Sequence, residues 1–109
     1  MLLFSNVFNM FGQEVTLYKQ FNGRYDFTFV GNTLNYNENN LTTDCIIQTS
    51  SSATLNLNAD DVILKAYMYW AGSGTGDFEV KLNGTDVISE RNFGLIQSSS
   101  GFPFFSAFA

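Results

Sequence analysis

The feature that most constrains the fold is the apolar run of residues 62–72, which leads into the glycine-rich segment 73–76. Alternate residues of a strand face opposite sides, and both sides of this run are apolar, with Lys65 as the only charge. Both faces must then be covered. We therefore predict a long core strand of an antiparallel β-sandwich, jelly-roll-like in its layers.

The rest of the chain favours the same class. From residue 13 onward no window has the three-four spacing of an amphipathic helix, whereas period-two alternation recurs between turn signals. The chain is therefore predicted to be all-β. Further strands are expected at 15–21, 25–31, 44–49, 53–58, 78–82, 85–88 and in the run 101–109, with an asparagine-rich loop at 32–43 and a polar turn at 58–61.

The strongest local signal is Asn83-Gly84 between two alternating runs. If these two residues form the turn, Lys81 faces Asp86 and Val80 faces Val87. The same register sets Leu82 opposite Thr85 and Glu79 opposite Ile88. The sequence thus predicts the pairing of this hairpin as well as its turn.

The 109 residues are enough for one domain. Residues 1–12 are apolar and uncharged in their side chains, and we interpret them as the remnant of a signal peptide or an N-terminal extension; a first strand or short helix is the alternative. Residues 13–109 form the predicted sandwich. Because the apolar run 101–109 ends the chain, we expect either internal pairing of this strand or a domain that is incomplete at its C-terminus.

Composition excludes several functions. Histidine is absent and Cys45 is the only cysteine, so imidazole catalysis, Cys/His zinc sites and an internal disulfide are excluded. Cys45 is either a buried thiol or the partner of a cysteine elsewhere. The net charge of -5 argues against nucleic acid as a partner, and no segment has the ~20 apolar residues of a membrane span.

Residues 15–35, 51–57, 66–77 and 106–109 together resemble the amino-terminal domain of large secreted surface proteins of Bacteroidetes. These are adhesin-like or gliding-motility-associated proteins exported by type IX secretion. The resemblance implies a jelly-roll or related sandwich at the bacterial outer surface, within a larger polypeptide, and it implies no catalytic residues.

Two sets of side chains are candidate binding residues. Tyr67, Tyr69 and Trp70 would form a platform for a sugar ring if one sheet face is open, although core packing is the favoured role for them. Asp60, Asp61 and Asp77 lie in or beside turns, as calcium ligands often do, but no calcium-loop spacing is present and ordinary turn chemistry is the favoured interpretation. We expect a non-enzymatic, secreted or cell-surface module that presents or binds a surface glycan or protein, with a carbohydrate-binding module as the alternative.

Overall fold

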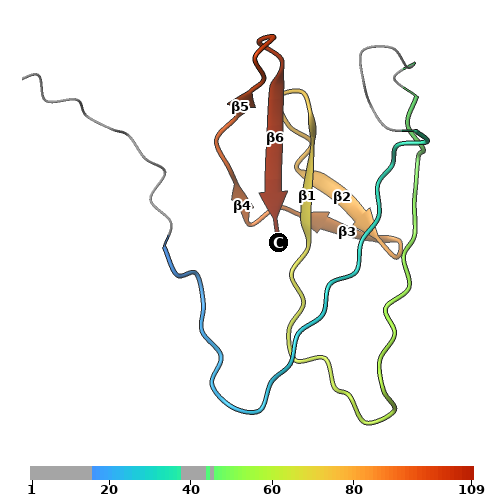
Figure 1. Cartoon of the computed structure of the whole chain (residues 1–109), viewed down its shortest axis with the longest axis vertical. Helices are drawn as coiled ribbons and strands as arrows, with labels where there is room; N and C mark the ends of the chain where they lie inside the picture. Colours follow the sequence, from blue (N-terminus) through green and yellow to red (C-terminus); the bar gives the residue numbers. More distant parts are fainter. Residues whose placement is uncertain (1–15, 38–43, 45) are drawn as a thin grey trace, which may run out of the picture. The chain divides into compact units, whose positions relative to one another are not determined.

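The computed structural model describes residues 16–37, 44 and 46–109 (Figure 1). The chain divides into two compact units, Met1–Asn56 and Leu57–Ala109. The described residues contain no helix, and every strand pairs antiparallel, so the fold is all-β as predicted. The predicted signal-peptide remnant at 1–12 and Cys45 lie outside the described residues.

The second unit is built around the C-terminal strand β6 (Pro103–Phe108). Strand β1 (Tyr69–Ser73) pairs with one edge of β6, and the short strands β4 (Arg91–Asn92) and β5 (Ile96–Gln97) pair with the other. In this register Tyr69 lies opposite Phe108, and Ala71 opposite Ser106. The apolar run at the end of the sequence therefore pairs internally, at the centre of a four-stranded sheet.

Strands β2 (Glu79–Leu82) and β3 (Thr85–Ile88) form a separate hairpin. Its register matches the prediction at every pair, including Lys81 opposite Asp86. Asn83 and Gly84 have φ of 50° and 79°, the left-handed conformation that a tight hairpin turn of two residues requires. Lys81 and Asp86 form an ion pair with both side chains largely exposed, so this pair contributes little to stability beyond fixing the register.

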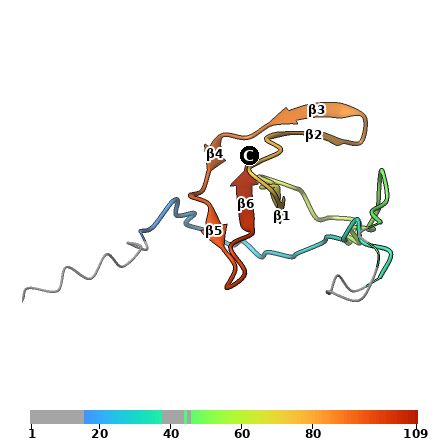
Figure 2. The same ribbon diagram turned by 90° about the horizontal axis from the view of Figure 1, so that it is seen from above.

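Alternate residues of β6 face the two sides of the sheet, and one side carries Phe105 and Ala107, which are 8% and 1% exposed. Phe78, at the start of the hairpin, packs edge-on against Phe105 with ring centroids 5.7 Å apart. Gly72 lies beneath the Phe105 ring, where a Cβ atom would be only 2.9 Å from Cε1. The hairpin lies to one side of β1 and β6 in the view from above (Figure 2). Through its contact with Phe105, the ring of Phe78 therefore covers part of the small core of this unit.

The predicted core strand at 62–72 is only partly correct. Strand β1 begins at Tyr69, and Met68 extends the pairing by one residue through two hydrogen bonds with Ala109, of 2.9 and 3.0 Å. Residues 62–66 lie outside any strand, and Val62 is 83% exposed. The expectation that both faces of the whole run are covered is wrong for this segment, because Ile63 and Leu64 on its two faces are also exposed. A second sheet packed over the first remains a prediction.

The described residues between 16 and 58 contain an isolated bridge between Asn35 and Ile47 but none of the predicted strands at 15–21, 25–31, 44–49 and 53–58. In the segment 25–31 alternate side chains still share one side of the chain, as the pattern predicts: the rings of Phe27 and Phe29 lie together with centroids 5.6 Å apart. The chain bends at Gly23, which has φ of 139°. Alternation defines a face, but a strand also needs a partner that accepts its backbone hydrogen bonds.

Asparagine turn chemistry is confirmed in the described part of the loop predicted at 32–43. The Asn32 side chain accepts a hydrogen bond from the Thr33 backbone N–H at 2.8 Å and donates one to the Ser52 carbonyl, also at 2.8 Å. Thr33 Oγ1 accepts a further bond from the Asn35 N–H at 3.1 Å. These bonds replace backbone pairing, as expected for such residues in turns. Residues 38–43 of this loop lie outside the described residues.

Candidate functional site

The three aromatic residues singled out by sequence do not lie on one face. Tyr67 and Tyr69 both contact Phe108, whereas Trp70 belongs to the opposite side of β1 and lies across from Ala107. The Trp70 indole N–H donates a hydrogen bond to the Asp77 carbonyl at 2.7 Å. Trp70 therefore ties β1 to the segment that leads into the hairpin, and the structure separates it from the other two rings.

The side of the sheet with Tyr67 and Tyr69 carries a cluster of rings centred on Phe108. The Tyr69 ring stacks on Phe108 at a centroid distance of 5.3 Å and an interplanar angle of 24°, and Tyr67 meets it edge-on at 6.3 Å. Phe93 stacks on the same ring at 6.1 Å, and its backbone N–H donates a bond to the Ser106 carbonyl at 3.0 Å. Phe108, only 2% exposed, is therefore the buried centre of the cluster. Backbone hydrogen bonds with β6 hold Tyr69 and Phe93 beside it.

Two cationic side chains flank this cluster. Lys65 Nζ lies 5.5 Å from the centroid of the Tyr67 ring, and the Arg91 guanidinium lies 5.9 Å from the centroid of the Phe108 ring. The position of Arg91 follows from the pairing of β4 with β6, which sets Arg91 directly opposite Phe108. We call the surface formed by Lys65, Tyr67, Tyr69, Arg91, Phe93 and Phe108 the aromatic face.

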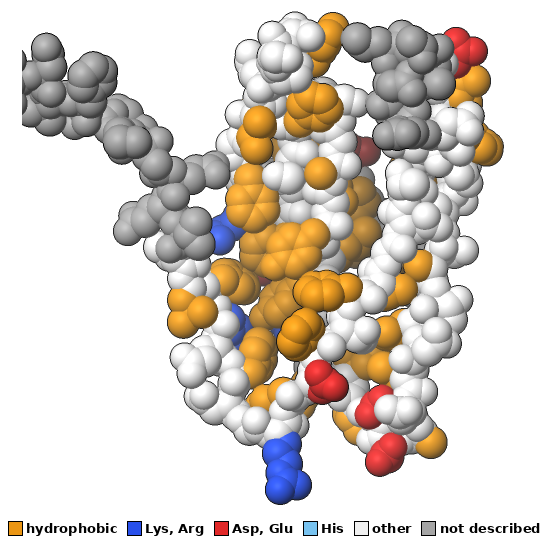
Figure 3. Space-filling model, viewed as in Figure 1, with side chains coloured by type: hydrophobic (Ala, Val, Ile, Leu, Met, Phe, Trp, Pro, Cys, Tyr) orange, Lys and Arg blue, Asp and Glu red, His pale blue; other side chains and the backbone are white. Residues whose placement is uncertain are grey.

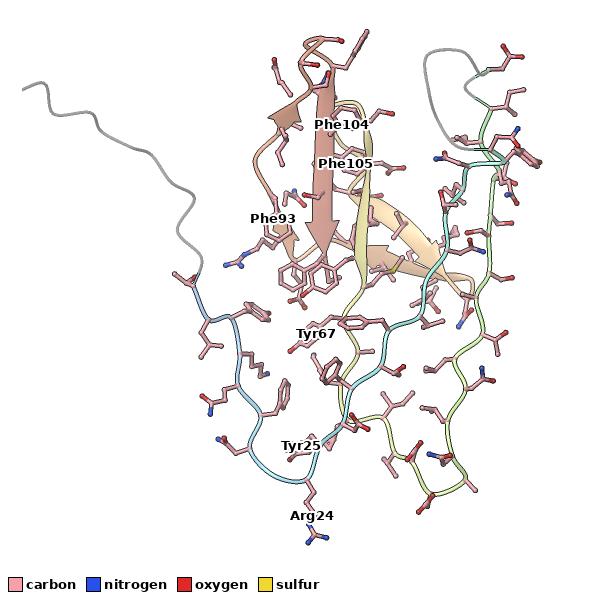
Figure 4. All side chains as sticks on the ribbon, in the orientation of Figure 1. Arg24, Tyr25, Tyr67, Phe93, Phe104 and Phe105 are labelled. Atoms are coloured by element: carbon pink, nitrogen blue, oxygen red, sulfur yellow. The ribbon has the colours of Figure 1, made fainter. Side chains whose placement is uncertain are left out.

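The outer rings of the aromatic face are open to solvent. Tyr69 is 66% exposed, Phe93 is 38% exposed and Tyr67 is half-buried. Phe93 lies beside the end of β6 and Tyr67 just beyond that end (Figure 4). Large hydrophobic side chains are visible at the surface in the space-filling view (Figure 3). The arrangement can offer the exposed ring of Tyr69 as an apolar contact with its hydroxyl as a polar tip, whereas the Tyr67 hydroxyl is buried, and two cationic side chains lie beside the cluster.

The acidic residues proposed as calcium ligands serve the turns in which they lie. Asp61 Oδ2 accepts hydrogen bonds from the backbone N–H of Asn58 at 2.7 Å and from its side-chain amide at 3.1 Å, and Asp60 lies within the same turn. Asp77 contributes its backbone carbonyl to Trp70. Among the residues that the structure describes, no three acidic or cysteine side chains come together as a metal site would require. The turn interpretation accounts for these contacts.

Sequence reasoning missed three members of the aromatic face, namely Arg91, Phe93 and Phe108. Phe108 was recognised only as part of an apolar run, because its position opposite Tyr69 depends on pairing between segments far apart in the chain. Arg91 lies in the two-residue strand β4 and Phe93 directly follows that strand, so no alternation is long enough to detect there. An aromatic residue near the end of an apolar run was the only available signal.

Comparison of the chain with protein-family models, with curated proteins and with solved structures finds no match. Within the described residues, no helix has the length and apolar character needed to cross a membrane.

Proposed function

We propose that this chain is a non-catalytic β module of a secreted or cell-surface, adhesin-like protein and that it acts by binding or presentation. The observation that carries the proposal is the stacking of Tyr69, 66% exposed, on the buried ring of Phe108. Exposed aromatic rings held by a sheet are typical of recognition surfaces, because little conformational entropy is lost when a partner covers them. The resemblance to bacterial surface proteins supports the same location.

A carbohydrate-binding module is the second candidate, and the aromatic face favours it specifically. Sugar rings have an apolar face that packs on flat aromatic rings, and the hydroxyl of the exposed Tyr69 can hydrogen-bond a sugar hydroxyl, whereas the Tyr67 hydroxyl is buried. Trp70, one of the three residues first considered for this role, is better explained as a structural contact because its indole N–H bonds to the Asp77 carbonyl.

Two measurements test this proposal. Protease treatment of intact cells that carry the gene, followed by detection with an antibody, should remove the protein if it is displayed at the surface. Binding of the purified chain to a glycan array should depend on Tyr69, so Tyr69→Ser should lower the signal several-fold. The control is Tyr36→Ser, which alters an exposed tyrosine outside the aromatic face. Protection from protease on intact cells would contradict surface display, and equal signals from the two variants would contradict recognition by the aromatic face.

A further inference from the structure

We propose that Asn22 is a site of non-enzymatic modification, where the side-chain amide is lost and aspartate or isoaspartate takes its place, while the fold protects Asn83 from the same reaction. The chain has two Asn-Gly dipeptides, Asn22-Gly23 and Asn83-Gly84, and all four residues are exposed. Asparagine is a labile residue, and a following glycine hinders attack by its own backbone nitrogen least, because it has no side chain. Since both sites are open to water, their backbone conformations decide which one reacts.

The reaction is an intramolecular substitution that needs only water and base. Base removes the proton of the Gly23 backbone nitrogen, which attacks Cγ of Asn22. A bond between that nitrogen and Cγ closes a five-membered succinimide ring, the bond between Cγ and Nδ2 breaks, and Nδ2 takes up a proton and leaves as ammonia. Water then opens the ring at the side-chain carbonyl, which gives aspartate, or at the main-chain carbonyl, which gives isoaspartate. Either product adds one negative charge to the net charge of -5.

The β2–β3 hairpin holds Asn83 away from the geometry of ring closure. Asn83 and Gly84 have φ of 50° and 79°, and the strands on either side of them are paired in register. In the left-handed conformation the next backbone nitrogen points away from Cβ, so Asn83 must leave this conformation before Gly84 can attack it. The pairing extends to Ser89, whose backbone N–H donates to the Phe78 carbonyl at 3.0 Å. Reaction at Asn83 therefore requires local opening of a hydrogen-bonded turn.

The backbone at Asn22 has no such restraint. Asn22 lies outside any strand, beside the bend at Gly23, and in the described part of the chain no backbone hydrogen bond holds either residue. Rotation of the backbone toward ring closure breaks no pairing there. The Gln20 side-chain amide donates a hydrogen bond to Oδ1 of Asn22 at 2.9 Å. This bond polarises the carbonyl that is attacked and favours the negative charge that develops on its oxygen.

The test follows both sites in one molecule. The full chain is incubated at mildly alkaline pH in water enriched in the heavy oxygen isotope, which ring hydrolysis incorporates, and is then digested with trypsin in ordinary water. The tryptic peptides 20–24 and 82–91 contain one asparagine each, so mass spectrometry gives a separate rate for each site. We expect peptide 20–24 to gain the label at least about tenfold faster, a ratio that corresponds to an opening free energy of about 1.4 kcal/mol for the hairpin.

Two controls separate the effect of the fold from that of the sequence. In urea that unfolds the chain, the two rates should become similar, because both sites have the same dipeptide. Asn22→Gln, which keeps an amide but would have to close a less favourable six-membered ring, should remove the label from peptide 20–24 and leave peptide 82–91 unchanged. Equal rates in the native chain would overturn the inference, as would a ratio that persists in urea. Absence of label from native peptide 20–24 would overturn the modification itself.

Discussion

Phe108 and Phe104 allow a sharp test of which side chains hold the second unit together. Both are phenylalanines of β6, and because they are four residues apart in a strand they face the same side of the sheet. Phe108 is 2% exposed and lies among the rings of the aromatic face, whereas Phe104 is 43% exposed. We expect Phe108→Ala to destabilise the unit far more than Phe104→Ala.

The magnitudes follow from burial. Truncation of a buried phenylalanine to alanine costs about 3–5 kcal/mol, because the lost transfer free energy is joined by the cost of the cavity. Phe104 buries only part of its surface, so its truncation should cost about 1 kcal/mol, a fraction of the roughly 1.5–3 kcal/mol for complete burial. A small domain has a total stability of about 5–15 kcal/mol, so the first loss is a large share of the total.

The assay is urea unfolding followed by fluorescence of Trp70, the only tryptophan, which lies in β1 opposite Ala107 and so reports on the pairing of β1 with β6. Phe108→Leu is included in case the alanine variant does not fold, and its loss should be intermediate. The reasoning is refuted if Phe104→Ala costs as much free energy of unfolding as Phe108→Ala, or if Phe108→Leu changes the unfolding midpoint no more than Phe104→Ala does.

Two further predictions concern packing and turns, both measured by the same unfolding assay. Gly72→Ala should cost about 1–3 kcal/mol, since its Cβ would lie 2.9 Å from Cε1 of the buried Phe105 ring, while Gly94→Ala, with nothing within 4 Å of its Cβ, should change stability by less than about 0.5 kcal/mol. Equal effects would contradict the close contact. Asp61→Ala should cost about 1 kcal/mol through loss of two turn hydrogen bonds, of 2.7 and 3.1 Å, and Asp60→Ala, which removes the same charge but neither bond, should cost less. An equal loss in both would show that charge, and not the bonds, matters in this turn.

Sequence reasoning succeeded where the information is local. The hairpin of β2 and β3 was predicted pair by pair, because Asn83-Gly84 permits one tight turn and the flanking alternation permits one register. The turn that contains Asp61 was predicted for a similar reason, as its side chain reaches backbone groups only three residues away. In both places a few neighbouring residues decide the geometry.

Sequence reasoning failed where the formation of a strand depends on a partner segment far away in the chain. The run 62–72 is apolar on both faces, yet it forms a strand only from Tyr69, where β6 pairs with it. The alternating segment with Phe27 and Phe29 likewise lies outside any strand. Hydrophobic pattern measures the preference of a segment for a face, but the backbone hydrogen bonds that define a strand come from another part of the chain.

The candidate site shows the same division. Sequence identified Tyr67 and Tyr69 as aromatic residues of one strand face, and alternation alone was enough for that. It grouped Trp70 with them and omitted Arg91, Phe93 and Phe108. Membership of the aromatic face depends on which residues of β6 pair with β1 on one edge and with β4 on the other.

The sequence by itself determined the all-β class, the β2–β3 hairpin with its register and the turn chemistry, because each depends on backbone preferences and contacts within a few residues. Only the tertiary structure decided that the C-terminal run is the central strand, that Phe108 is buried, and that Lys65 and Arg91 flank one cluster of rings. These features arise from pairing between segments far apart in the chain. Many alternative pairings satisfy the same pattern, and the free energy of packing selects among them.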